Sequence, residues 1–201
     1  MIANKKKAIL ITGATGFIGK YIVEHAIKNN YEVFIAVRGT SNTARINHLR
    51  FKTILVDFSS EESIYKSFPE TICFDAVVHN AGVTSCFLKE DYHKYNVELT
   101  KNLCAVLVKQ SMLKGKFIFT SSLAALGPET NNLEKDITEL KNPNPISSYG
   151  SSKLLAEKEV MNSGVNYTII RPTAVFGEGT LDYKDLISIV KKGLAVYTAS
   201  P

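Results

Sequence analysis

Short apolar runs alternate with longer amphipathic segments from Ala8 to Arg171. Runs of Val and Ile without polar alternation are typical of strands covered on both faces, as in a parallel sheet. Regular strand–helix alternation favours right-handed crossovers and a doubly wound, mostly parallel α/β sheet, the Rossmann arrangement. Strands are expected at Ala8–Thr12, Glu32–Val37, Thr53–Val56, Ala76–His79, Lys116–Ser121 and Asn166–Arg171. Helices are expected near Phe17–Lys28, Thr43–Leu49, Ser60–Ser67, Asp91–Leu113, Tyr149–Ser163 and Leu181–Leu194.

Composition narrows the classes of function. A net charge of +5 comes from scattered lysines, and the only dense run is Lys5-Lys6-Lys7. Without a basic stripe interleaved with aromatics, we expect no nucleic-acid partner. No apolar stretch is long enough to span a bilayer, so no membrane partner is expected. Cys73, Cys86 and Cys104 lack metal-ligand spacing, which predicts no metal site and reduced thiols in a cytoplasmic protein.

A glycine-rich turn joins the first expected strand to the first expected helix. Gly13, Gly16 and Gly19 follow a G-x-x-G-x-x-G pattern. Glycines at such a turn let a pyrophosphate approach the backbone, while the helix N-terminus presents amide groups to phosphate. A dinucleotide site is predicted here, and the alternative is a glycine turn that binds no ligand. The expected contacts also include Thr15, Phe17 and Ile18.

Arg38 indicates which dinucleotide binds. An NAD site usually places an acidic residue about 20 residues beyond the glycine turn, where it accepts the ribose 2′-hydroxyl. Arg38 ends the second expected strand instead. A guanidinium suits a 2′-phosphate and offers no acceptor, so NADP is preferred over NAD. The alternative is a surface arginine without a ligand, and Lys52 or Arg45 could assist Arg38.

Tyr149 and Lys153 lie four residues apart at the start of an expected helix, and therefore share one face. A free tyrosine has a pKa near 10, and a nearby ammonium favours the phenolate. We therefore expect Lys153 to lower the pKa of Tyr149 and to reach the nicotinamide ribose. The pair Ser121-Ser122 ends an earlier strand and offers a hydroxyl to a substrate oxygen. These groups suit a proton transfer coupled to hydride transfer.

The order of these motifs resembles the extended short-chain dehydrogenase/reductase superfamily, the NAD(P)-dependent epimerase/dehydratase branch, and its dihydroflavonol-reductase-like subgroup. The resemblance implies that Ser122, rather than Ser121, acts with Tyr149 and Lys153, and that Asn96 supports a proton relay. An ordinary helix asparagine is the alternative for Asn96. His79 is implied to be structural, and Arg171 to anchor a loop. The cofactor contacts implied by resemblance are Asp57, Phe58, Asn80, Ala81, Gly82, Tyr149, Lys153, Pro172, Thr173 and Val175.

Asp57 has a second interpretation, as the cap of the helix that begins near Ser60. The segment between Pro128 and Pro145 is polar and lacks a clear period, which indicates a long loop at the active-site edge. Residues 1–180 are expected to form the dinucleotide-binding domain. Residues 181–201 are expected to begin a substrate-binding lobe that this chain largely lacks, and a homodimer is considered.

Three functions follow from the resemblance. The first is an oxidoreductase that moves a hydride between nicotinamide and a carbonyl or secondary alcohol, with Tyr149 as acid/base. The second is a nucleotide-sugar epimerase or dehydratase that holds its cofactor tightly. The third is a non-catalytic dinucleotide-binding module. A small-molecule substrate is expected for the first two, and its identity is left open by the sequence.

Overall fold

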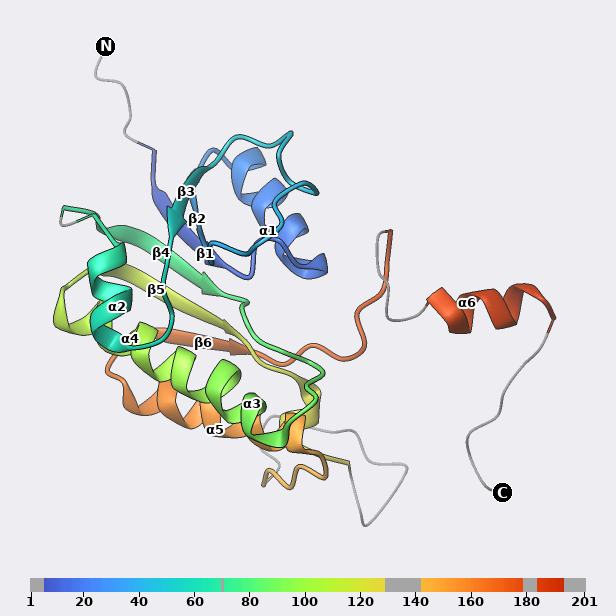
Figure 1. The fold of residues 1–201 in the computed structure, drawn as a ribbon. Coiled ribbons are helices and arrows are strands. Elements are labelled where there is room, and N and C mark those ends of the chain that lie inside the picture. Colours follow the sequence, from blue (N-terminus) through green and yellow to red (C-terminus); the bar gives the residue numbers. More distant parts are fainter. Residues whose placement is uncertain (1–5, 70, 129–141, 179–183, 194–201) are drawn as a thin grey trace.

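A computed structural model of the chain describes residues 6–69, 71–128, 142–178 and 184–193. Within them, parallel strands form a six-stranded sheet in the order β3-β2-β1-β4-β5-β6 (Figure 1). The predicted doubly wound fold is therefore confirmed. The strands are β1 (Ala8–Thr12), β2 (Glu32–Val37), β3 (Lys52–Leu55), β4 (Phe74–His79), β5 (Leu113–Thr120) and β6 (Tyr167–Ile170).

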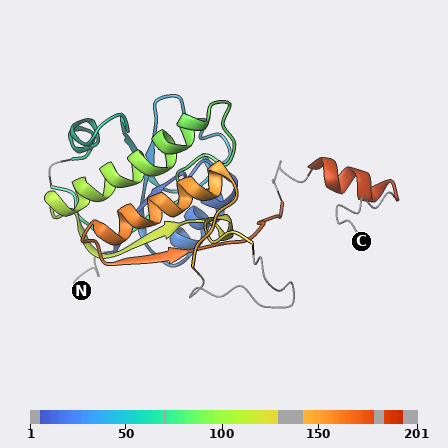
Figure 2. The ribbon, with the colours of Figure 1, turned by 90° about the horizontal axis from the view of Figure 1, so that it is seen from below.

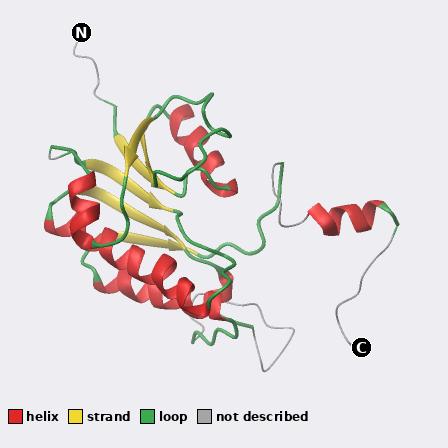
Figure 3. Ribbon diagram, viewed as in Figure 1, coloured by secondary structure: helices red, strands yellow, loops and turns green. Residues whose placement is uncertain are grey.

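Helices lie on both faces of the sheet, and α6 lies away from it (Figure 3). They are α1 (Phe17–Lys28), α2 (Glu61–Ser67), α3 (Lys89–Tyr92), α4 (Leu99–Lys109), α5 (Ser148–Asn162) and α6 (Lys184–Lys191). A π-helical segment, η1 (His93–Glu98), joins α3 to α4, and a short 3-10 turn, η2 (Leu123–Ala125), follows β5. Helices α4 and α5 lie side by side on one face (Figure 2).

Alternation along each strand divides the core into two layers. Leu10 packs beneath α2, α4 and α5, whereas Ile9 and Ile11 pack with α1 on the opposite face. Because side chains alternate across a strand, an uninterrupted apolar run serves both layers at once. The sheet edge at which the strands end lies between these layers, and the turn, Ser122 and Arg171 all follow strands at that edge.

The expected helix at Thr43–Leu49 is wrong, because residues 44–48 form turns. The Asn42 side chain accepts a hydrogen bond from the Ala44 amide, and the Ile46 amide donates to the Thr43 carbonyl. Such local side-chain bonds compete with a helix. Ile46 is fully buried and anchors the segment against α1.

The expected helix Asp91–Leu113 is also corrected. It is divided into α3, η1 and α4, and it ends at Lys109. Ser111 has a φ of 50°, in the left-handed region, and the Met112 amide turns back to the Leu107 carbonyl. Leu113 therefore begins β5, three residues before the expected strand start at Lys116.

Other boundaries shift by a few residues. Of the expected helix Leu181–Leu194, the described part is α6, and most of the loop between Pro128 and Pro145 lies outside the described residues. No helix among the described residues is long and apolar enough to cross a membrane. The same residues contain no cluster of His, Cys, Asp and Glu that could hold a metal ion.

Candidate active site

The glycine turn holds two strand ends together. Gly13 has a φ of 67°, and a Cβ built there would lie 2.6 Å from the backbone of Asn80 and Ala81 after β4. Glycine at this position therefore meets both a left-handed φ and a close backbone approach. Gly16 is the N-cap of α1, which leaves the first amides of the helix facing the turn.

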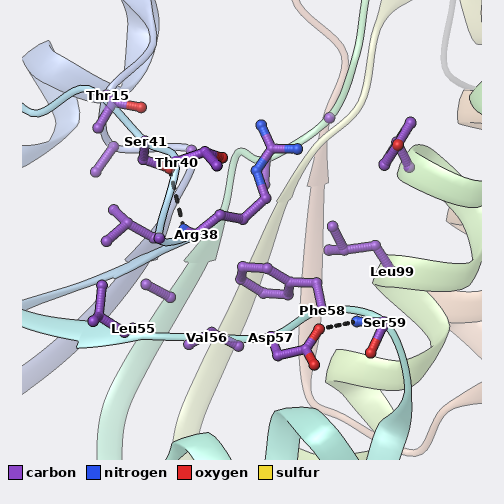
Figure 4. Close-up of a pocket in the computed structure, with 18 of the residues that line it drawn as sticks. Thr15, Arg38, Thr40, Ser41, Leu55, Val56, Asp57, Phe58, Ser59 and Leu99 are labelled. Carbon is purple, nitrogen blue, oxygen red and sulfur yellow. Dashed lines mark hydrogen bonds between the residues drawn. The ribbon is translucent and has the colours of Figure 1, made fainter.

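Beside this turn lies a cavity of about 810 Å³. The Arg38 side chain extends into it from the end of β2, and Asp57 and Phe58 enter from the segment after β3 (Figure 4). Lys52 lies away from it in an ion pair with Glu32 at 2.6 Å. Of the two expected helpers of Arg38, neither lines this cavity. The predicted contacts that do line it are Gly13, Thr15, Gly16, Arg38, Asp57, Phe58, Asn80, Ala81 and Gly82.

Asp57 does not cap α2. That role belongs to Ser60, whose hydroxyl accepts from the Ser63 amide at 3.0 Å. Asp57 accepts instead from the Ser59 amide at 2.9 Å, as Figure 4 shows. Hydrogen bonds from Ser59 lower the pKa of the Asp57 carboxyl. Its carboxylate therefore stays charged beside the cavity.

His79 lies inside the protein and lines neither cavity. Its Nδ1 bonds the Thr12 hydroxyl at 2.7 Å and its Nε2 the Thr100 hydroxyl at 2.9 Å. Thr100 donates its own proton to the Asn96 carbonyl, so Nε2 must carry the imidazole proton. Burial, with a contribution from Lys153, lowers the pKa of His79 to about 3. A neutral, fully bonded imidazole serves structure, which agrees with its implied role.

A second cavity, of about 970 Å³, adjoins the first and shares Gly16, Asn80 and Gly82 with it. Ser122 enters from the end of β5, and Tyr149 and Lys153 enter from the first two turns of α5. Ser147 caps α5 by accepting from the Gly150 amide at 3.0 Å, which places Tyr149 at the start of the helix. The predicted residues that line this cavity are Gly16, Phe17, Ile18, Asn80, Gly82, Asn96, Ser122, Tyr149, Lys153, Pro172, Thr173 and Val175.

The pKa of Tyr149 differs from the expectation. Burial raises it, and the nearby Tyr92 adds to the increase, while a hydrogen bond with Ser122 opposes both. Lys153 does not lower this pKa in the structure, because its ammonium bonds the Thr120 carbonyl at 2.7 Å and lies over the Phe119 ring at 4.3 Å. A buried phenol without an adjacent cation favours its neutral form.

Burial lowers the pKa of Lys153 to about 8, and the charge of Glu157 opposes that decrease. The side chain is 4% exposed, and its Nζ lies 3.9 Å from the position that a Cβ on Gly82 would take. The atom that this Cβ would crowd is the Asn96 amide oxygen, at 2.8 Å, so glycine at position 82 makes room for the Asn96 side chain. Because Gly82 lines both cavities, Lys153 lies close to the point at which they meet.

Asn96 connects η1 to this centre. Its side chain exchanges hydrogen bonds with the Val83 backbone at 2.8 and 3.0 Å and donates to Ser152 at 2.9 Å. Ser152 in turn donates to the Tyr149 carbonyl at 2.7 Å. Asn96 is thus a fixed structural link between the segment after β4 and α5, at the cavity wall. Its part in a proton relay stays a prediction.

Two other expectations have clear outcomes. Gly19 lines neither cavity, and a Cβ there would lie 2.0 Å from the Gly13 carbonyl oxygen, so it serves close packing of α1. Ser121 and Arg171 are both bonded to the buried Glu157, in agreement with structural roles. Arg45, expected as a helper of Arg38, lines the second cavity instead. Sequence reasoning assigned no role to several other lining residues: Lys94, Tyr95, Glu98, Asn102 and Ile146.

The two adjoining cavities fit a dinucleotide. The first combines a bare glycine turn, a helix N-terminus, Arg38 and the exposed edge of Phe58, which suit phosphates, a ribose and an adenine. The second places Ser122, Tyr149 and Lys153 beside the shared glycines, where the nicotinamide end would lie. The protein would hold NAD or NADP with these residues.

Comparison with known proteins agrees with this geometry. The family model described as "NAD dependent epimerase/dehydratase family" matches residues 9–195. UDP-glucose 4-epimerase of Vibrio cholerae is 32% identical over 94% of this chain and 58% of its own length. The decarboxylating sterol-4-alpha-carboxylate 3-dehydrogenase of Dictyostelium discoideum is 25% identical over 88% of this chain and 56% of its own length.

The fold has close neighbours among solved structures. The Bordetella bronchiseptica enzyme WbmG, in complex with NAD, superposes with a TM-score of 0.80 at 20% identity, covering 98% of this chain and 63% of that one. This chain spans little more than half the length of the curated relatives above. The match over residues 9–195 shows that the chain belongs to the NAD-dependent epimerase/dehydratase family, an enzyme family of the extended short-chain dehydrogenase/reductase superfamily.

Proposed function

We propose that this protein is an NAD(P)-dependent enzyme that transfers a hydride at a carbonyl or secondary alcohol carbon, with Tyr149 as the acid/base. One observation carries the proposal: Ser122, Tyr149 and Lys153 meet in one cavity that adjoins the glycine-turn cavity. A module that only senses a dinucleotide would not need these three groups on the wall of a second cavity. A non-catalytic role is therefore disfavoured.

The residues divide the chemistry among them. When bound, the nicotinamide supplies or takes the hydride. Tyr149 gives a proton to the substrate oxygen during reduction and accepts it during oxidation, because its hydroxyl faces the cavity beside Ser122. Ser122 donates a hydrogen bond to the same oxygen and stabilises the charge that develops on it. The Lys153 ammonium lies along the same helix face, where it favours the phenolate once it faces Tyr149.

Two reactions use this set of groups. A net oxidoreductase exchanges its cofactor in every turnover, whereas a nucleotide-sugar epimerase regenerates it in place. The relatives compared above include both classes, a UDP-glucose 4-epimerase and a sterol dehydrogenase. We propose the oxidoreductase first and the UDP-sugar epimerase second. The second candidate is supported by the 32% identity to the Vibrio cholerae epimerase, against 25% to the dehydrogenase.

We further propose that NADP is the preferred cofactor. Arg38 follows the last residue of β2 and lines the cavity, and its backbone amide is held by the Ser41 hydroxyl at 3.1 Å. Thr40 and Ser41 add hydroxyls on the same side of the cavity (Figure 4). This cationic and hydroxyl-rich corner suits a 2′-phosphate. The family model is named for NAD, so NAD is the alternative cofactor.

A deuterium experiment separates the candidate reactions. In one arm the protein is incubated with simple carbonyls and NADPH that carries deuterium at C4. In the other arm it is incubated with UDP-hexoses and the oxidised cofactor, because an epimerase must first take a hydride from its substrate. An oxidoreductase places deuterium in the product and accumulates NADP. An epimerase converts the UDP-hexose without net change in cofactor absorbance. Tight cofactor binding with neither product, over a broad panel of both substrate classes, would contradict the catalytic proposal and favour the sensing module.

A further inference from the structure

Glu157 is a buried carboxylate directly behind the candidate catalytic groups. It is fully buried, on α5, one turn beyond Lys153. Its Oε1 accepts from the Ser121 hydroxyl and from the Arg171 Nε, and its Oε2 accepts from an Arg171 terminal nitrogen at 2.8 Å. All three donors therefore converge on one carboxylate, and Arg171 binds it in the bidentate geometry.

The two residues that donate these hydrogen bonds follow different strands at the site. Ser121 directly precedes Ser122, and Arg171 directly precedes Pro172 and Thr173, which line the second cavity. The backbone joins the same two segments, because the Ser121 amide donates to the Ile170 carbonyl at 2.8 Å. Glu157 therefore ties the ends of β5 and β6 to the helix that carries Tyr149 and Lys153.

The charge of Glu157 also acts on Lys153. Among the described residues, the titratable groups that interact with the Lys153 ammonium are Glu157 on α5 and His79 on β4. Tyr149 lies one turn before Lys153 on α5, and Arg171, after β6, is paired with Glu157. His79 is neutral, and the Tyr149 phenol is held in its neutral form by burial. Glu157 is consequently the negative charge that favours protonated Lys153 against the cost of burial.

We propose that Glu157 is a positioning residue that holds Ser122, the segment after Arg171, and Lys153 in one arrangement and keeps the lysine charged. A buried ion pair is by itself weak evidence for stability, because desolvation can exceed the attraction between the charges. If the Arg171 guanidinium cancelled the charge of Glu157, the pair would serve the fold alone, and the titration of Lys153 would not depend on Glu157. The proposal rests on the proposed function only in naming Lys153 as catalytic, since its titration is measurable without a substrate.

The test measures the pKa of Lys153 in the folded protein. Amine labelling with acetic anhydride, followed by peptide mass spectrometry, gives the reactivity of Lys153 as a function of pH. In Glu157→Gln the midpoint should fall by about one pKa unit, because an opposite charge is lost. The shift is downward because the charged form of lysine is the protonated one. Without the carboxylate, Lys153 loses its proton at lower pH, so labelling at neutral pH increases several-fold.

Glu159→Gln is the matched control, because it makes the same substitution on the same helix, two residues further on. Its Lys153 midpoint should stay unchanged. If Glu157→Gln alone unfolds, the double variant Glu157→Gln/Arg171→Gln removes both charges of the pair. Its Lys153 midpoint should fall by less than in the single variant, because a neighbouring positive charge is lost as well. A folded Glu157 variant with an unchanged Lys153 midpoint overturns the proposal.

A catalytic readout then separates this proposal from the proposed function. Where the protein turns over a substrate, Glu157→Gln should move the alkaline limb of the kcat profile to lower pH, and Glu159→Gln should not. A shifted Lys153 midpoint in a protein without any turnover would support the positioning role and contradict the catalytic function. An unshifted Lys153 midpoint in an active enzyme would contradict the positioning role of Glu157 and support the catalytic function.

Discussion

At the scale of single residues, Tyr149 shows how much its chemistry depends on neighbours. Burial raises its pKa, and the Ser122 hydrogen bond alone lowers it. The Lys153 ammonium is bonded to the Thr120 carbonyl rather than directed at the phenol. For Tyr149 to act as a base, the ammonium or another positive charge must therefore come to face it. The sequence could predict the pair of residues but not which acceptor the lysine chooses.

Tyr149→Phe tests this residue directly. The change removes the proton donor and keeps the ring, so cofactor affinity should stay close to the original value. Turnover should fall by at least about a hundredfold, which is a typical contribution of general acid–base catalysis. Tyr92→Phe is the matched control, because Tyr92 lies beside Tyr149 with ring centroids 6.2 Å apart but does not line the cavity. Near-normal turnover in Tyr149→Phe would remove the residue from the mechanism.

Arg38→Asp tests the cofactor proposal. An aspartate would repel a 2′-phosphate and could accept the 2′-hydroxyl of NAD. We therefore expect the affinity for NADP to fall by more than about tenfold, while the affinity for NAD is kept or improved. Calorimetric titration with both cofactors gives the ratio, and Arg45→Asp is the control because Arg45 lines the second cavity instead. An unchanged ratio in Arg38→Asp would contradict the NADP proposal.

At the scale of elements, the strands could be predicted and the intervening turns could not. Val and Ile runs identified every strand to within a few residues, because a strand buried on both faces imposes its pattern locally. The turn at 44–48 depends on the local Asn42 hydrogen bond and on burial of Ile46 against α1, whereas the π-helical segment depends on contacts with distant residues. Asn96 holds η1 through the Val83 backbone and Ser152, which are far from it in sequence. The helical periodicity of the sequence alone does not predict these hydrogen bonds.

Candidate site residues also divide into those with a local sequence pattern and those that only the fold brings together. Glycine spacing and the Tyr149–Lys153 spacing are local, so they were accessible from sequence. Glu157 lies four residues beyond Lys153, yet nothing in the sequence shows that Ser121 and Arg171 meet it. Arg45 and Ile146 likewise reach the second cavity only through the path of their loops. The part of the site that the sequence could not predict consists of contacts between side chains on different elements.

Gly19→Ala tests the packing of α1 on the turn. The added Cβ would lie 2.0 Å from the Gly13 carbonyl oxygen, so the helix must shift. Overpacking of this kind typically costs about 1–3 kcal/mol, and the free energy of unfolding should fall by that amount. Gly39→Ala is the control, since no atom lies within 4 Å of its added Cβ, and its effect should stay within about 0.5 kcal/mol. Urea denaturation of both variants checks this, and equal stabilities would contradict the packing argument.

At the scale of the whole molecule, the two cavities differ in the exposure of the side chains at their rims. The first cavity is lined by the glycine turn and by residues of β2, β3, η1 and α4, all of them described. At the rim of the second cavity Ile146 is 80% exposed, and Phe176, next to the cavity-lining Val175, is 76% exposed. The chain spans 58% of the length of the Vibrio cholerae relative. Apolar side chains so exposed at a cavity rim are typical of a surface that another segment or ligand covers.

We therefore expect residues 1–201 to bind the cofactor well and to transfer a hydride poorly. NADP at about 100 times its Kd should stabilise this chain by about 2.7 kcal/mol, because its binding residues are in place. Hydride transfer also needs near-attack geometry and exclusion of water, which an exposed cavity rim does not supply. Thermal denaturation with and without NADP, paired with stopped-flow measurement of nicotinamide absorbance on the substrate panel, tests both halves. Transfer by residues 1–201 at rates of about 1 to 1,000 s⁻¹, typical of enzymes, would show that the substrate site is complete within this chain.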